Sequence, residues 1–381
     1  MNELRNVVTR QVSPRAAGFA RIVLGAGALL KVIERAPVLD RLSDPSVVRA
    51  PYLVAQPSLA DLPPELVVIV WIVLATAFAV GAYTTLSGIA LTGLLAAVLL
   101  SDQQLYSNHL YLLTWLVGLL TLARSGSALS IDARMGRGRR TIPAWPIALV
   151  RLQVVVVYLF AGLAKVNFTY LSGSVVAASL RSEGPLAIPM EWRTFELMAG
   201  AAILSILAEI GLAVGLLLPK WRRTAFVVGL GLHVGIAIVF DPTLPLIVFA
   251  LIILSPYVLF LDDRPGRLTV VWDDSCTFCR GWVAWFRRLD WLGAVRLVPN
   301  SDDAALDRLD VRREEADQAL QLISDDSRAQ GFRAVVGILE ALPVSFLLAP
   351  LLRLWPIARI GDAVYRRVAG RRSCGITHPL G

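Results

Sequence analysis

Residues 145–166 read WPIALVRLQVVVVYLFAGLAKV, and Arg151 and Lys165 are the only charged residues among them. A transmembrane helix needs about 20 mostly apolar residues, so this stretch predicts a membrane span. Seven other stretches have a similar composition. They are Ala16–Ile33, Leu66–Ala82, Thr85–Leu100, Leu110–Leu122, Ala199–Leu217, Thr224–Val239 and Leu244–Leu261. The sequence therefore predicts a polytopic α-helical membrane domain of about eight spans.

The composition of the chain agrees with this prediction. Of 381 residues, 56% are hydrophobic and 17% are charged, and the mean hydropathy is +0.63. Soluble domains carry about 25% charged residues. The net charge of +8 comes mostly from arginines in short loops between apolar stretches. That arrangement is a signal of membrane topology. We therefore expect membrane lipid as a partner, and no nucleic acid.

Three basic clusters set the expected orientation. With an even number of spans they all lie on one side of the membrane, which the positive-inside rule assigns to the cytoplasm. We therefore expect a multi-pass protein of the bacterial inner membrane with both termini in the cytoplasm. The first span lacks a small-residue cleavage site, so we expect it to be retained. The clusters are Arg5, Arg10 and Arg15; Arg124, Arg134, Arg137, Arg139 and Arg140; and Lys220, Arg222 and Arg223.

The composition changes at residues 262–266, DDRPG. We expect a membrane domain over residues 1–262 and a small α/β thioredoxin-like domain over residues 263–381. The second part has short β-like runs, such as Leu268–Trp272, between amphipathic segments. The apolar stretch Val344–Ile360 contains two prolines, which predicts packing or membrane-skimming helices instead of a ninth span.

Cys276 and Cys279 form a CxxC pair that follows a predicted strand and opens a predicted helix. The positive end of the helix dipole favours the thiolate of Cys276. Cys276 is then expected to attack a disulfide, and Cys279 to resolve the mixed disulfide. A zinc half-site and an inert pair are the alternatives, and we expect no metal because a second pair of cysteines is missing. Cys374 lies outside the motif and is expected to be a spectator.

Ionisable residues inside membrane spans are costly, so each is a functional candidate. The predicted topology puts His109 and Lys165 at one depth near the outer face, where they can form a proton-handling pocket. Apolar surroundings favour the neutral amine of Lys165, which can act as a base. Structural roles are the alternative: snorkelling for Lys165, a helix start for His109, and buried polar contacts for the others. The others are Arg21, Glu209 and His233.

Several of these residues lie in recognisable motifs. Residues 107–112, SNHLYL, resemble the Asn-His-x-Tyr-Leu motif of the vitamin K-dependent γ-carboxylase and its bacterial relatives, the HTTM family. Residues 158–165, YLFAGLAK, resemble that family's Tyr-Phe-x-Ala-Gly-x-x-Lys motif, and residues 21–25, RIVLG, are similar to its Arg-x-x-x-Gly. Glu209 and His233 fall where the family has an acidic residue and a histidine. The resemblance covers roughly Ser13 to Leu261.

The resemblance implies a function for these positions. Lys165 matches the lysine that deprotonates vitamin K hydroquinone, and His109 matches the histidine that assists it. The implied cofactor is a vitamin K-like quinol such as menaquinol. Substrate- or cofactor-binding roles are implied for Arg21, Tyr158, Glu209 and His233. The animal carboxylase also has a large β-rich extramembrane domain, and the short outer loops here leave no room for one, which counts against glutamate carboxylation.

Residues 273–279, DDSCTFC, resemble the Asp-x-x-Cys-x-x-Cys motif of the DCC family of thiol-disulfide oxidoreductases. The resemblance extends from Leu268 to about Arg372 and implies disulfide exchange with a partner protein. Asp274 stands where the family usually has glycine. We expect this aspartate to alter the turn or to add a proton acceptor beside Cys276.

The leading hypothesis is a membrane quinol-linked redox enzyme with an attached thiol-disulfide oxidoreductase domain. The predicted topology puts Lys165 at the outer face and Cys276 in the cytoplasm, so we expect no direct contact between them. The alternative hypothesis is a transporter, a membrane-anchored scaffold, or a maturation or immunity factor for a secreted peptide.

Overall fold

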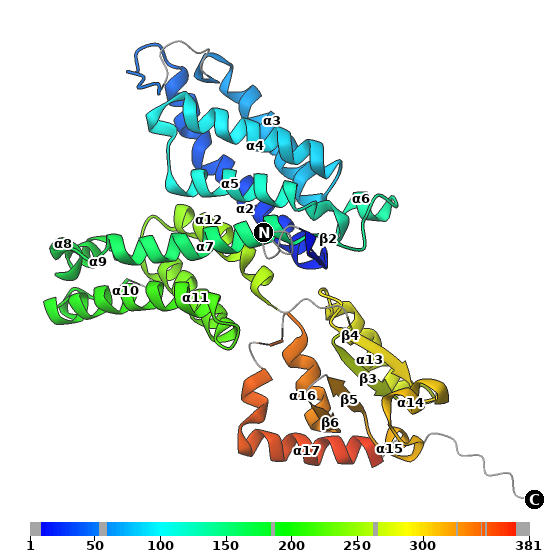
Figure 1. Cartoon of the computed structure of the whole chain (residues 1–381). Helices are drawn as coiled ribbons and strands as arrows, with labels where there is room; N and C mark the ends of the chain where they lie inside the picture. The colour runs from blue at the N-terminus through cyan, green and yellow to red at the C-terminus, as the bar shows by residue number, and fades with distance from the viewer. Residues whose placement is uncertain are drawn as a thin grey trace, which may run out of the picture. The chain divides into compact units, whose positions relative to one another are not determined.

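The computed structural model of the protein describes residues 9–52, 59–183, 187–261, 266–324, 327–343, 345–346 and 349–370. The chain divides into two compact units, Met1–Asp262 and Asp263–Gly381. The first unit is helical, and the second combines helices with a small sheet (Figure 1). Each unit is described by itself.

Within the described residues, six helices of the first unit are long and apolar enough to cross a membrane, and two apolar helices are shorter. These eight helices correspond one by one to the eight predicted spans, which confirms the predicted fold class. The six are α2 (Arg15–Ser43), α4 (Thr84–Ser101), α7 (Ala144–Ala164), α10 (Phe195–Leu217), α11 (Arg222–Val239) and α12 (Thr243–Leu254), which continues into η5 (Ser255–Phe260); the shorter ones are α3 (Pro64–Val80) and α5 (Asn108–Leu122).

Short elements connect these helices. Two-residue strands pair antiparallel near the start of α2 and α7, namely β1 (Gln11–Val12) with β2 (Ile142–Pro143). The predicted turn between α3 and α4 is tight, because Gly81 and Tyr83 both have left-handed backbones, with φ of 71° and 45°. The remaining elements are η1 (Leu59–Asp61), η2 (Gln103–Leu105), η3 (Ser125–Ser127), α6 (Ile131–Arg134), α8 (Phe168–Leu171), α9 (Ser174–Ser179) and η4 (Met190–Trp192).

Helix α2 lies at the centre of the first unit and packs against α3, α5, α12 and η5. It approaches α3 closely, because a Cβ at Gly25 would lie 2.5 Å from the Cβ of Ala79. Small residues at such crossings let helix backbones approach each other in membranes. The helix is longer than predicted: it continues ten residues beyond the expected end at Ile33, to Ser43, and includes Pro37.

Arg21, on the first half of α2, joins three segments of the chain. Its side chain is fully buried. The guanidinium donates hydrogen bonds to the carbonyls of Ser125 at 2.9 Å, Leu129 at 2.6 Å and Ala79 at 3.4 Å. Carbonyl oxygens at helix ends and in loops need donors when they are buried. Arg21 therefore fixes the end of α3 and the loop after α5 onto the central helix.

The second unit contains a four-stranded mixed sheet in the order β4-β3-β5-β6. Strand β3 (Leu268–Trp272) pairs parallel with β4 (Val295–Pro299) and antiparallel with β5 (Gln321–Ser324), which pairs with β6 (Arg328–Gln330). Helix α13 (Thr277–Leu289) connects the parallel pair. The other helices are α14 (Asp303–Leu309), α15 (Arg313–Gln318), α16 (Phe332–Ala341), η6 (Ala349–Arg353) and α17 (Trp355–Gly370). This is the predicted small α/β domain.

Successive residues of β3 serve opposite faces of the sheet, as the two-residue period of a strand requires. Val270 packs with Phe286 of α13 and Ile338 of α16. Val271 packs with Val298 and with Leu306 of α14. The predicted apolar stretch 344–360 ends inside α17, which begins at Trp355, continues to Gly370 and has no buried residue.

Candidate functional site

Three buried side chains form a hydrogen-bonded chain inside the first unit. The hydroxyl of Tyr257 donates to the hydroxyl of Tyr158 at 2.7 Å, and the Tyr158 hydroxyl lies 2.6 Å from Nε2 of His233. Because Tyr158 accepts from Tyr257, its own proton can be donated to His233 when Nε2 is unprotonated. Gly229 leaves room for this chain, since a Cβ there would lie 2.2 Å from the Tyr257 hydroxyl.

His109, near the start of α5, is linked to these three hydrogen-bonded side chains through an aromatic contact. Its ring stacks on Phe249 of α12, with 4.3 Å between ring centroids and an interplanar angle of 18°. The ring of Phe249 also packs edge-to-face against that of His233, with 5.4 Å between the ring centroids. His109 and His233 lie within electrostatic range of each other. The two histidines, 124 positions apart in the sequence, therefore flank one phenylalanine.

Lys165 and Glu209 form an ion pair between the end of α7 and the middle of α10. The carboxylate side chain is only 9% exposed, whereas the lysine is 27% exposed and its Nζ lies 5.5 Å from the ring centroid of Tyr170. Oε2 of Glu209 is buried and has no hydrogen-bond partner among the described residues. His233 lies within electrostatic range of Lys165, and Tyr158 within range of Glu209.

The structure thus brings together five of the six residues proposed for the membrane site. Four helices, α5, α7, α10 and α11, supply them. Such a group can accept, hold and pass on protons in surroundings with little water. Arg21 is separate, because its guanidinium is committed to the carbonyls described above. The five are His109, Tyr158, Lys165, Glu209 and His233.

A second ionic group on α2 escaped the sequence analysis. Lys31 is fully buried and pairs with Glu34 at 2.6 Å, and Arg35 contacts the same carboxylate oxygen at 3.0 Å. All three lie within electrostatic range of His109. Buried Oε2 of Glu34 and Nε of Arg35 have no hydrogen-bond partner among the described residues. The sequence does show these charges, as KVIER at residues 31–35. The predicted end of the first span, at Ile33, falls in the middle of this group.

The CxxC pair lies where the motif predicted, between β3 and α13. Cys276 is the N-cap of α13, and its Sγ accepts a hydrogen bond from the backbone N–H of Cys279 at 3.4 Å. Both cysteines are buried, with 5% and 9% of their surfaces exposed. A sulfur held against the first turn of a helix experiences the positive end of the dipole, as expected for a nucleophilic thiolate.

The aspartate beside the cysteines is Asp273. Its side chain is 7% exposed, and one oxygen lies within 4.8 Å of both sulfurs. The side chain of Asp274 contacts Ser301 instead, and its Oδ2 accepts a hydrogen bond from the Ser301 hydroxyl at 2.8 Å. The expectation that Asp274 is the proton acceptor near Cys276 is therefore corrected in favour of Asp273. Asp273, Cys276 and Cys279 also make three potential metal ligands, one fewer than a structural zinc site uses.

An apolar groove of about 390 Å³ adjoins the CxxC pair. Cys279, Phe278 and Trp282 form the wall on the α13 side, and Ile360 and Val364 are among the α17 residues on the other side. Helix α17 sits close to α16, because a Cβ at Gly361 would lie 2.2 Å from the ring of Phe332. A molecule that reaches Cys279 through this groove meets almost entirely apolar surface.

A bundle of apolar helices with buried ionisable groups, followed by an α/β domain with a CxxC pair at a helix N-terminus, defines a multi-pass, redox-related membrane protein. The HTTM domain profile matches residues 9–263, and the chain belongs to that family. The DCC1-like thiol-disulfide oxidoreductase profile matches residues 270–374. Both matches confirm the resemblances found in the sequence. Searches of curated proteins and of solved structures find no match.

The Lys165–Glu209 pair yields an asymmetric prediction for stability. Lys165→Met leaves the buried Glu209 carboxylate unpaired, which we expect to cost about 3–5 kcal/mol. Glu209→Gln should cost less, because Lys165 is more exposed and can reach water. The double variant should recover most of the loss, since neither charge remains. Chemical denaturation of the purified full chain measures these changes.

Lys220→Met serves as a control at an exposed lysine and should change little. Additive losses in the double variant would show that the two side chains are not coupled in the folded protein, and equal losses in the two single variants would contradict the predicted asymmetry.

Proposed function

We propose that the protein couples thiol–disulfide exchange at Cys276 and Cys279 to a membrane-soluble, vitamin K-like quinol of the menaquinol class. The observation that supports the membrane half most directly is the buried chain Tyr257–Tyr158–His233 beside the Lys165–Glu209 pair. Uncharged tyrosines alone fit a structural role. An ion pair with an unpartnered carboxylate oxygen, next to two histidines, favours proton transfer.

Lys165 is the proposed base for the quinol. When the proton of its ammonium passes to Glu209, the pair becomes neutral and Lys165 becomes an amine. That amine accepts a proton from a quinol hydroxyl, which leaves a quinol anion and an ammonium. His109 and His233 are the proposed hydrogen-bonding groups for the quinol oxygens, and stacking on Phe249 orients His109.

The dithiol carries out the electron transfer. In the proposed reaction Cys276 and Cys279 give two electrons and two protons to a quinone, so that their thiols become a disulfide and the quinone becomes a quinol. A partner protein's dithiol then reduces the disulfide through a mixed disulfide with Cys276. The groove beside Cys279 suits an apolar quinone ring. A quinone diffuses in the bilayer, so the two sites need no direct contact.

The proposed orientation places both termini in the cytoplasm of a bacterial cell, because the three basic clusters share one side. A reporter enzyme that is active only outside the cytoplasm should therefore be inactive when fused after Gly381. The same reporter inserted at Asp61, in the connection after the first span, should be active. A strong external signal from the fusion at Gly381 would reverse the topology and with it the outer location of Lys165.

The two cysteines should have separable roles. In a Cys374→Ser background, Cys276→Ser should abolish thiol–disulfide exchange, assayed in the reverse direction as reduction of a disulfide substrate, because the sulfur that forms the mixed disulfide is lost. Cys279→Ser should instead accumulate a mixed disulfide through Cys276, visible on a non-reducing gel and by mass spectrometry. The background variant alone should retain activity. Disulfide reduction that survives Cys276→Ser would exclude the proposed nucleophile.

A base at position 165 should not be replaceable by arginine, since a guanidinium stays protonated. With a reduced short-chain naphthoquinol under anaerobic conditions, the wild-type protein should form the quinol anion rapidly, as followed by stopped-flow absorbance. Lys165→Arg should lose at least 100-fold in rate, within the usual range for general-base catalysis. Small added amines should partly restore the rate of anion formation in the Lys165→Ala variant.

Lys220→Arg is the matched control and should keep the wild-type rate. If Lys165→Arg forms the anion as fast as the wild type, Lys165 is an interfacial anchor and the proton-transfer proposal fails. Anion formation by the Cys276→Ser variant should be normal, because the two half-reactions occur at separate sites.

A further inference from the structure

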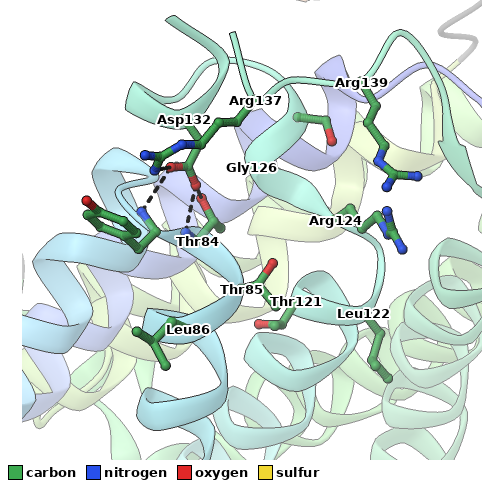
Figure 2. A pocket seen from close by; sticks show the side chains of 12 residues that line it. Thr84, Thr85, Leu86, Thr121, Leu122, Arg124, Gly126, Asp132, Arg137 and Arg139 are labelled. Carbon is green, nitrogen blue, oxygen red and sulfur yellow. Dashed lines mark hydrogen bonds and ion pairs between the residues drawn. The ribbon is translucent and has the colours of Figure 1, made fainter. Parts of the chain in front are cut away.

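A pocket of about 650 Å³ with both charged and apolar walls lies where α4 begins and α5 ends (Figure 2). Three arginines contribute to its wall: Arg124, directly after α5, and Arg137 and Arg139, in the loop before α7. These arginines belong to one of the basic clusters that are expected to face the cytoplasm. Nothing in the proposed function uses this pocket, and none of the residues of the membrane redox site lines it.

The one acidic side chain in the wall, Asp132, is already committed. Its carboxylate accepts hydrogen bonds from the N–H and the hydroxyl of Thr84, both at 2.7 Å, and from the N–H of Tyr83 at 3.0 Å. Burial alone would raise the pKa of Asp132, but these bonds and the charge of Arg137 hold it below its ordinary value. Asp132 is therefore ionised at neutral pH and neutralises Arg137, which lies 3.5 Å away.

Arg124 and Arg139 have no such partner. Neither side chain makes a hydrogen bond or an ion pair with the part of the chain that the structure describes. Figure 2 shows their guanidinium groups turned toward one another on one side of the pocket. Two like charges that face each other repel, so an anion that contacts both would stabilise this arrangement.

The other end of the pocket is apolar and faces outward. Leu86 on α4 and Leu122 at the end of α5 line it, and their side chains are 69% and 54% exposed. Helices α4 and α5 pack along each other, so this end follows the surface of the bundle. The hydroxyl-bearing residues Thr85 and Thr121 lie between the leucines and the arginines in Figure 2. The pocket thus changes from cationic to apolar along its length.

We propose that this pocket binds a phosphate group between Arg124 and Arg139. Guanidinium forks pair with phosphate oxygens in bidentate fashion, and an arginine pair can hold one phosphate from two sides. An anionic phospholipid headgroup and a phosphate ion share this chemistry. The lipid-exposed leucines favour the phospholipid, whose acyl chain would lie along Leu86 and Leu122. Basic pockets at the cytoplasmic ends of membrane helices bind anionic lipid headgroups in this way.

The test uses the purified full chain in nanodiscs of neutral phosphatidylcholine. Phosphatidylglycerol is added in steps to one series and inorganic phosphate to another, and the melting temperature is followed. Native mass spectrometry counts the phosphatidylglycerol molecules retained. The wild type should be stabilised by phosphatidylglycerol and retain at least one molecule. Arg124→Gln/Arg139→Gln should lose one retained molecule and require at least tenfold more phosphatidylglycerol for the same stabilisation.

The matched control is Arg10→Gln/Arg134→Gln, which removes two exposed arginines and the same charge outside the pocket. It should behave as the wild type does. Stabilisation by inorganic phosphate alone, lost in the pocket variant, also supports the site and identifies a phosphate ion as its ligand. Equal losses in the two double variants, or no response of the wild type to either additive, would overturn the proposal. If the pocket variant unfolds, Arg139→Gln alone provides the same comparison.

Discussion

The energetic cost of charge inside a membrane organises the first unit. An ionised side chain among lipid chains or apolar side chains is stable only when another charge or several dipoles neutralise it. Arg21 meets this requirement with backbone carbonyls from α3 and from the loop after α5. Lys165 meets it with Glu209, and Lys31 with Glu34. The Arg21 and Lys165 contacts join different segments and so help to determine which helices pack together, whereas the Lys31–Glu34 pair lies within α2.

These charges differ in how completely they are satisfied, and that difference separates structure from chemistry. Four backbone carbonyls accept hydrogen bonds from the two terminal nitrogens of Arg21 and stabilise its cation, although its buried Nε has no hydrogen-bond partner among the described residues. In contrast, Glu209 and Glu34 each have a buried oxygen without a hydrogen-bond partner among the described residues. An unsatisfied buried carboxylate oxygen costs free energy and persists where a ligand or a proton uses it. Both such oxygens belong to ion pairs whose lysines lie within electrostatic range of one of the two histidines beside Phe249.

The sequence was sufficient for the features that depend on composition and short motifs. Continuous apolar stretches predicted the eight helices, and a strand followed by CxxC predicted that Cys276 caps a helix. It was insufficient where contacts join distant segments. Tyr257 sits in an apolar run and has no pattern that marks it as a partner of Tyr158. Asp273 and Asp274 are adjacent and chemically identical, and only the turn geometry decides which one faces the sulfurs. The ion pair of Lys31 was missed because Glu34 and Arg35 lie beyond the predicted end of the first span at Ile33.

In the proposed reaction, a lipid-soluble redox carrier links the chemistry of the two units. A quinone ring must be desolvated to react, and both proposed sites offer apolar walls beside one reactive group: Phe249 beside the two histidines, and Trp282 beside Cys279. Reduction of a quinone by a dithiol also transfers two protons from the thiols, and in the proposed scheme Lys165 accepts one proton from the resulting quinol to give its anion. The use of two distinct sites has a physical advantage in this scheme, because a thiolate and an amine base in one site would compete for the same proton. A diffusing carrier also allows each site to have its own neighbouring carboxylate, Asp273 beside the thiols and Glu209 beside the amine.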